Sequence, residues 1–75
     1  MSKSKLIKMG KMHGTIAIDE VSEDKVEALA SEAWWNVAFF EAEDQGLLGD
    51  FDDEDAETIF MRSFTEAYKK KKGWL

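Results

Sequence analysis

The chain has 75 residues, of which 44% are hydrophobic and 35% are charged, and its formal net charge at neutral pH is −6. This length allows one small domain and leaves little room for a catalytic domain with separate substrate-binding walls, while the hydrophobic content excludes a wholly disordered chain. The sequence contains no cysteine, which excludes a disulfide framework, a thiolate nucleophile and a zinc knuckle, and its single histidine cannot build a histidine metal cluster.

The N-terminal region predicts a short β-hairpin. Residues 5–9 and 15–18 are interpreted as two strands, because the second of these runs alternates β-branched and smaller residues. Gly10 and Gly14 then bracket a turn between the strands. We expect residues 1–4 to be disordered, because nothing in them can be buried.

Residues 23–45 predict a first helix. Ser22 is a suitable N-cap, and Gly46 is expected to end the helix in the left-handed conformation. Apolar residues recur at helical spacing on one side and predict the face that packs in the core. These residues are Val26, Leu29, Ala30, Ala33, Val37 and Phe40.

Residues 53–72 predict a second helix, with acids in its first turn, lysines in its last turn and Gly73 as its end. A short connection between the two helices favours an antiparallel pair. We therefore expect an α+β fold, mostly α, in which a short N-terminal β-hairpin or strand precedes an antiparallel two-helix hairpin, within a single small domain over 1–75. The predicted apolar stripe of the second helix is Ala56, Phe60, Phe64 and Ala67, widened by Ile59, Met61 and Tyr68.

The charges are unevenly distributed along the chain. Residues 1–18 carry +4, residues 19–57 carry −14 and residues 58–75 carry +4. Compensation of helix dipoles accounts for the acids at the helix starts but not for several others in the middle of the chain. The unexplained acids form either a solvated face or an acidic binding face, and they are Glu32, Glu41, Glu43, Asp44 and Asp50.

Trp35 and Phe39 predict an interaction surface. At helical spacing they lie about 180–220° around the axis from Val26, opposite the predicted core face. A two-helix hairpin buries only one face of each helix, so something else must cover these two rings. The candidates are the N-terminal strands through Leu6, Ile16 and Ile18, the tail Trp74–Leu75, a second copy, or a foreign partner.

The sequence carries no motif of an enzyme or a metal site. The acidic run Asp50–Glu57 resembles a calcium loop, but Asp55 stands where the loop requires glycine and Met61 where it requires a bidentate glutamate. There is no P-loop, dinucleotide fingerprint or Ser/His/Asp chain order, and His13 is interpreted as a surface residue. We therefore predict a protein that is not an enzyme and has no catalytic residues, metal ligands or cofactors.

We interpret the chain as a non-enzymatic acidic protein that occludes or modulates a larger, basic-surfaced protein partner, for which a nucleic-acid-handling host enzyme is the natural class. Its build resembles that of the small acidic inhibitors, some of them DNA mimics, that bacterial viruses and mobile elements use against host machinery. This resemblance covers the whole chain and lies in composition, not in a motif. The predicted partner-binding residues are Trp35, Phe39, Glu32, Glu43, Asp44, Asp50 and Phe51.

Two other functions stay open. One is a small structural or assembly protein that forms a homodimer or larger oligomer through Trp35 and Phe39, and the other is a cation-responsive module that uses Asp50–Glu57. Direct DNA binding is not expected, because the acidic middle of the chain repels the phosphate backbone. The basic start is not followed by the apolar run of a signal peptide, and no stretch approaches the roughly 20 apolar residues of a membrane span. We therefore expect a soluble, cytoplasmic protein that does not contact a membrane.

Overall fold

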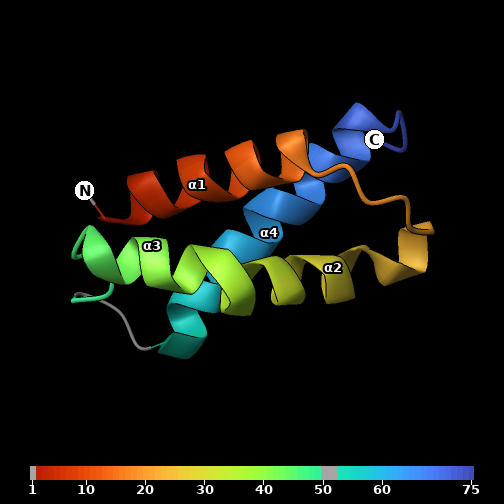
Figure 1. Cartoon of the computed structure of the whole chain (residues 1–75). Helices are drawn as coiled ribbons and strands as arrows, with labels where there is room; N and C mark the ends of the chain where they lie inside the picture. Colours follow the sequence, from red (N-terminus) through yellow and green to blue (C-terminus); the bar gives the residue numbers. More distant parts are fainter. Residues whose placement is uncertain (1, 50–52) are drawn as a thin grey trace.

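The computed structural model describes residues 2–49 and 53–75, and these residues form three helical segments (Figure 1). The first and the last segment are single helices, and the middle segment is a continuous helical run that changes its type along its length. In chain order the elements are α1 (Ser2–Ile16), η1 (Glu23–Lys25), α2 (Val26–Ala33), η2 (Trp34–Ala38), α3 (Phe39–Asp44) and α4 (Asp53–Lys71).

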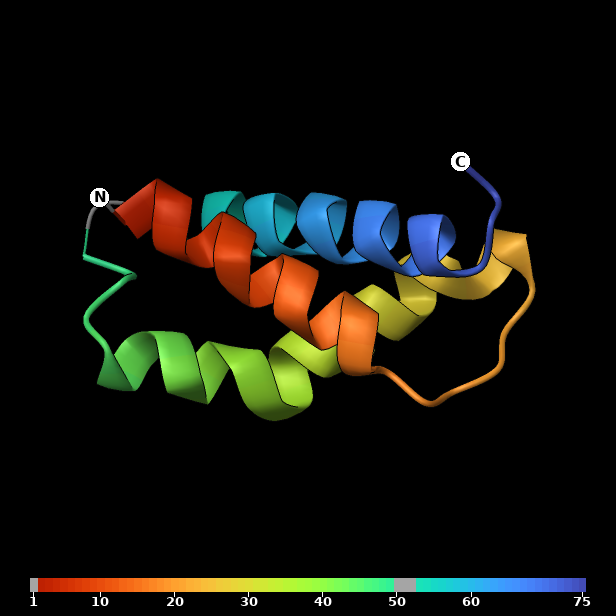
Figure 2. The same ribbon diagram turned by 90° about the horizontal axis from the view of Figure 1, so that it is seen from above.

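The three segments pack side by side. Figure 2 shows α1 and α4 running in the same direction, while the middle segment from η1 to α3 runs in the opposite direction. The middle segment and α4 therefore form an antiparallel pair, as in the expected helical hairpin, and α1 adds a third helix to it. None of the helices in the described residues is long and apolar enough to cross a membrane.

The predicted α+β fold is wrong, because the N-terminal region is helical. The residues predicted as a strand or hairpin, 5–18, belong to α1 as far as Ile16, and the described part of the chain contains no strand. Residues 2–4, which we expected to be disordered, lie in the first turn of the same helix.

Gly10 and Gly14 explain the error. They lie one helical turn apart on the side of α1 that faces α4, and both are buried. A Cβ atom at Gly10 would lie 2.6 Å from the carbonyl oxygen of Phe60, and one at Gly14 would lie 2.5 Å from that of Phe64. The two glycines thus allow the backbones of α1 and α4 to approach each other closely, and they do not form a turn.

Gly46 and Gly73 end the middle segment and α4, as predicted. Their φ angles are 71° and 79°, which is the left-handed region that glycine adopts without steric cost. The residue after each glycine donates its N–H to a carbonyl five residues earlier, at 2.9 Å from Leu47 and at 2.8 Å from Trp74. Each helix therefore ends in a Schellman motif that satisfies its last carbonyl groups.

The hydrophobic core lies where the three segments meet. In the stripe predicted for α4, Ala56, Phe60, Phe64 and Tyr68 are buried, while Ile59, Met61 and Ala67 are half-buried. The middle segment contributes residues that recur every four positions, and α1 contributes two large side chains. The buried hydrophobic residues outside α4 are Leu6, Met9, Val26, Ala30, Trp34, Ala38, Ala42 and Leu47.

A π-helical turn decides which residues of the middle segment face the core. The predicted face assumed a regular α-helix and placed Val37 and Phe40 inward. The wider turn of η2 instead keeps Ala38 and Ala42 on the core side after Trp34. Val37 and Phe40 are turned outward as a result, and 53% and 57% of their surfaces are exposed.

Candidate functional site

A hollow of about 310 Å³ lies between the end of α1, the linker that follows it and the middle segment. We call it the apolar hollow, because most of the side chains that line it are apolar. Three of them are largely exposed: 62% of the surface of Ile16, 90% of that of Ile18 and 53% of that of Val37. Two acids, Asp19 and Glu32, also line it.

Two further exposed residues extend this apolar surface along both helices. Met12 precedes Ile16 by one turn of α1, and Phe40 follows Val37 by about one turn of the middle segment. Both are about half exposed, at 48% and 57%. A contiguous exposed apolar patch of this kind marks an interaction site more often than scattered single residues do.

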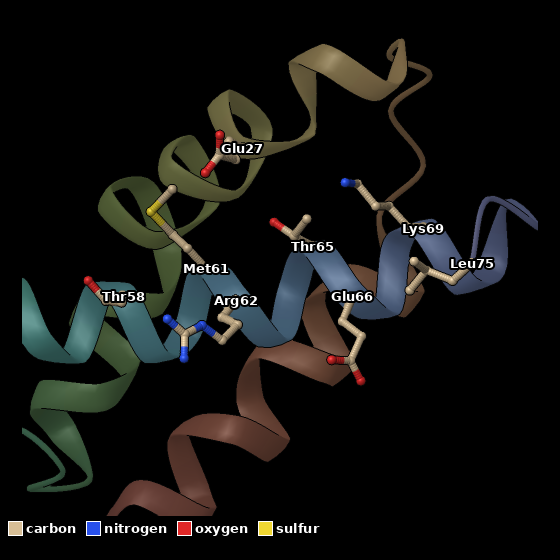
Figure 3. Close-up of a pocket in the computed structure, with 8 residues that line it drawn as sticks. All are labelled: Glu27, Thr58, Met61, Arg62, Thr65, Glu66, Lys69 and Leu75. Atoms are coloured by element: carbon tan, nitrogen blue, oxygen red, sulfur yellow. The ribbon is translucent and has the colours of Figure 1, made fainter.

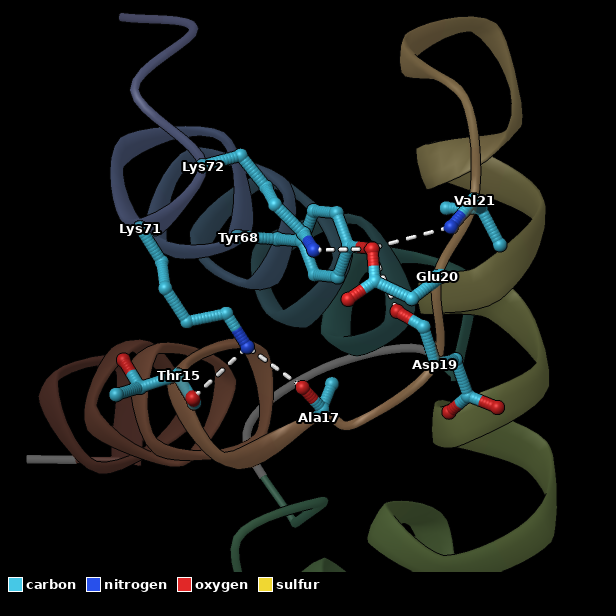
Figure 4. A network of polar contacts seen from close by, with 8 residues as sticks. All are labelled: Thr15, Ala17, Asp19, Glu20, Val21, Tyr68, Lys71 and Lys72. Atoms are coloured by element: carbon cyan, nitrogen blue, oxygen red, sulfur yellow. Dashed lines mark hydrogen bonds and ion pairs between the residues drawn. The ribbon is translucent and has the colours of Figure 1, made fainter.

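Tyr68 holds in place the linker that carries Ile18 (Figure 4). The Tyr68 hydroxyl donates a hydrogen bond to the carbonyl oxygen of Asp19 at 2.6 Å and accepts one from the N–H of Val21 at 3.3 Å. The tyrosine ring is fully buried, so these two bonds join the linker to the core. The exposure of Ile18 therefore does not come from a loose loop end.

Two lysines of the C-terminal run fix the same linker (Figure 4). Lys71 Nζ donates to the carbonyl oxygens of Thr15 at 3.0 Å and Ala17 at 2.6 Å, at the end of α1, where carbonyl groups lack a partner within the helix. Lys72 Nζ lies 2.5 Å from the carboxylate of Glu20. The hydrogen bond between these two groups lowers the pKa of Glu20 and raises the pKa of Lys72.

Trp35 and Phe39, which were predicted as partner anchors, lie next to each other, with 5.4 Å between their ring centroids. Trp35 donates its indole N–H to the Glu57 carboxylate on α4 at 2.7 Å and is 45% exposed. The sequence had suggested the N-terminal strands or the C-terminal tail as internal cover and had overlooked α4. The ring of Phe40, about one turn beyond Val37 of the hollow, lies 5.7 Å from that of Phe39.

The predicted acidic residues do not converge on one point. Glu32 is exposed at the apolar hollow. Glu43 and Asp44 are exposed at the end of α3, about 17 Å farther along the middle segment at the rise of a helix. Asp50 and Phe51 lie outside the described residues. The acids therefore flank the apolar surface at its two ends.

His13 lies half-buried at the apolar hollow, so its assignment to the surface is wrong. Its ring meets that of Phe60 edge-on, with centroids 5.6 Å apart. Its Nε2 atom is 3.7 Å from the Glu41 carboxylate, which is too long for a hydrogen bond. Among the described residues no group of three or more His, Cys, Asp or Glu side chains lies close enough to hold a metal ion.

A second hollow, of about 450 Å³, lies on the outer side of α4 (Figure 3). Charges of both signs alternate along it, among them Glu27, Arg62, Glu66 and Lys69. In Figure 3 Glu66 extends toward α1, while Lys69 extends toward α2. Met61 and Leu75 also line it, so the surface mixes apolar residues with charges of both signs and does not favour a partner of one charge.

The apolar residues around the hollow were missed as site residues. Ile16 and Ile18 had been assigned to a strand, and Val37 and Phe40 to the core. A sequence signal could have identified Val37 and Phe40 as exposed. Apolar residues recur every four positions from Val26 to Ala42, and a regular α-helix cannot keep such a series on one side.

No protein-family model, curated protein sequence or solved structure matches the chain. A functional assignment therefore depends on the chemistry of the exposed surfaces. The apolar hollow can bury apolar side chains of another molecule, and the acids at its ends can attract positive charge.

Proposed function

We propose that the protein is a non-enzymatic binding protein that docks through the apolar hollow on a larger, basic-surfaced protein and thereby occludes or modulates it. The observation that carries this proposal is the exposure of Ile16, Ile18 and Val37 around one hollow, with the exposed Phe40 about one turn beyond Val37. An apolar centre with a charged rim is the usual arrangement of a protein–protein interface.

The apolar residues account for affinity. Complete burial of an exposed aliphatic or aromatic side chain stabilises a complex by about 1.5–3 kcal/mol, and these four are already about half covered or less. Their burial together contributes several kcal/mol of binding free energy. A micromolar complex requires a net binding free energy of roughly 8 kcal/mol, and the cost of association has to be overcome in addition. The hollow is therefore sufficient for the centre of an interface but needs further contacts around it.

The acids account for the choice of a basic partner. Asp19, Glu32, Glu43 and Asp44 form no ion pair with any described residue, so their charges are free to act on an approaching molecule. Such charges speed the encounter with a positive surface and favour it over a negative one. A nucleic-acid-handling enzyme in the cytoplasm has a positive groove of this kind, and its occlusion is the action we propose.

An assembly protein that docks on a second copy of itself is the alternative, and it uses the same exposed apolar residues. Trp35 is less suited to this role than the sequence suggested, because its indole N–H is already bonded to Glu57 on α4. Val37 and Phe40 replace it as the residues to substitute in an experiment, and the identity of the bound protein distinguishes the two functions.

The test is a quantitative pull-down of the tagged protein from its native host. Wild type is compared with the double variant Val37→Ser/Phe40→Ser and with the control Leu75→Ser, which changes an exposed apolar residue outside the apolar hollow. We expect a basic nucleic-acid-binding protein to be recovered with wild type and the control and lost with the double variant. Equal recovery with all three would contradict the proposal, and recovery of the chain alone would support self-assembly. Circular dichroism establishes that each variant is folded.

A further inference from the structure

The outer groove between α1 and α4 is a second charged surface, on the other side of α1 from the apolar hollow. Two adjoining hollows of about 300 and 460 Å³ make up this groove, and they share Lys11 and Glu66. We call it the basic groove. One acid, Glu66, lines it, against five cations: Lys3, Lys11, Arg62, Lys70 and Lys71.

Most of these cations are not neutralised. Lys71 bonds to carbonyl groups at the end of α1. The side chains of the other four have no hydrogen bond or ion pair with any described residue, even though Glu66 lies in the same groove. Four positive charges without partners therefore face solvent along one groove.

The geometry of the groove fits a linear polyanion. Lys3 and Lys11 are eight residues apart on α1, and Arg62 and Lys70 are eight residues apart on α4, which corresponds to about 12 Å along each helix. Because the two helices run parallel (Figure 2), these pairs form two rows of positive charge, one on each wall. A chain of regularly spaced phosphates can meet both ends of each row.

We infer that the basic groove binds the backbone of duplex nucleic acid through phosphate contacts that do not depend on base sequence. A duplex is favoured over a single strand because none of the described residues lining the groove is aromatic and available for base stacking. A membrane is disfavoured because the large apolar residues of the groove, Ile7 and Ile59, are half-buried and cannot insert into lipid.

The net charge of −6 does not prevent this contact. The expectation that the chain does not bind DNA assumed that the acids in its middle act on DNA as strongly as the basic residues at its ends. In the structure seven of the fifteen acids of that middle region lie in the segment from η1 to α3. Four more lie at the start of α4, and none of these eleven acids is among the described residues that line the groove. The molecule is 34 × 20 × 18 Å across. Charges on its far side are screened, since the Debye length at physiological salt is about 8 Å.

The inference does not depend on the proposed docking through the apolar hollow, because the two surfaces share no residue. The two are compatible, since a partner that handles nucleic acid brings a duplex close to the bound protein.

The experiment is a fluorescence anisotropy titration of a short, mixed-sequence, labelled DNA duplex with the full chain. Each phosphate contact contributes about −0.9 to the slope of log affinity against log salt, so four contacts weaken binding by about 10²-fold between about 50 and 200 mM salt. Absence of binding at the lower salt concentration, or binding indifferent to salt, would overturn the inference.

Matched charge reversals locate the contact. Lys11→Glu/Arg62→Glu should weaken binding at least about tenfold and reduce the salt slope by about two. The control Lys5→Glu/Lys25→Glu changes the net charge equally at exposed positions outside the groove and should have a much smaller effect. An equal loss with both variants would mean that the groove is not the binding site.

Glu66→Gln gives a test in the opposite direction. Removal of the groove's acid should tighten duplex binding about threefold or more at low salt, an effect that unfolding cannot imitate.

Two further measurements test other occupants of the groove. The protein is titrated with anionic lipid vesicles, and the sedimentation of the protein alone is measured at several salt concentrations. Binding to vesicles without binding to the duplex would assign the groove to lipid. Salt-dependent self-association that Lys11→Glu/Arg62→Glu abolishes, again without duplex binding, would assign it to a second copy of the chain. Either result would overturn the inference.

Discussion

Substitution of alanine for Gly10 or Gly14 tests the close packing of α1 on α4. In an open helix Gly→Ala raises stability by about 1 kcal/mol, because alanine is the better helix former. Here the new Cβ at Gly10 would lie 2.6 Å from the Phe60 carbonyl oxygen and 2.7 Å from the Ser63 Cβ. The corresponding distance at Gly14 is 2.5 Å to the Phe64 carbonyl oxygen. The substitution must therefore push the two helices apart.

The size of the effect follows from these contacts. Overpacking of a close-packed interior costs about 1–3 kcal/mol, and here the cost lies near the upper end because backbone atoms cannot rotate away. After subtraction of the propensity gain of about 1 kcal/mol, each substitution should destabilise the protein by about 1–2 kcal/mol. That is a large fraction of the roughly 4–11 kcal/mol expected for a domain of this size.

Urea unfolding followed by tryptophan fluorescence and circular dichroism measures the change, since Trp34 is fully buried in the core. Gly49→Ala is the matched control: its Cβ would come no closer than 3.9 Å to another atom, and its φ is not positive. The control should change stability by less than about 0.5 kcal/mol. If Gly10→Ala and Gly14→Ala instead stabilise the protein, the packing of α1 described here is wrong.

Three further predictions concern the core and the linker. Phe64→Ala should cost about 3–5 kcal/mol, because the ring is 1% exposed, and a melting temperature within a few degrees of wild type would contradict its place in the core. Tyr68→Phe should cost about 1–3 kcal/mol, because two backbone groups of the linker lose their partner, and hydrogen exchange should then quicken at residues 17–22 and not in α4. Because the pKa of Glu20 is lowered, its pairing with Lys72 stabilises the fold at pH values above the ordinary carboxyl pKa of 4.5. This contribution is lost as the pH falls through the lowered pKa. Thermal unfolding of wild type and Glu20→Gln should therefore differ slightly near neutral pH, less in high salt and not at all in strong acid; a difference that grows on acidification would contradict the pairing.

The sequence predicts those features of the fold that depend on local physics. Gly46 and Gly73 end their helices, and the stripe of α4 is buried, because caps and helical periodicity act within a few residues. The helix α1 was missed because Gly10 and Gly14 disfavour helix locally. The two glycines favour the fold by allowing α1 to pack closely on α4, more than forty residues away in the chain. No local pattern in the sequence reveals that contact.

The apolar residues around the hollow were missed for a related reason. Trp35 stands out in the sequence as an aromatic residue opposite the expected core face, and it is indeed partly exposed. Val37 and Phe40 fit the core stripe of a regular helix, and only the π-helical turn of η2 moves them to the surface. Trp34 and Ala38, at the two ends of this turn, are both buried in the core, and periodicity alone does not predict that outcome.

Site-specific photo-crosslinking in the native host tests most directly the central claim that the apolar hollow is the docking surface. A benzophenone amino acid is placed at Val37 and, as a control, at Leu75, two exposed positions that line different hollows. We expect ultraviolet light to join the Val37 derivative to a larger, basic protein, and the Leu75 derivative to give little of this adduct. The claim is contradicted if both positions yield the same adducts, or if Val37 yields adducts only with a second copy of the chain.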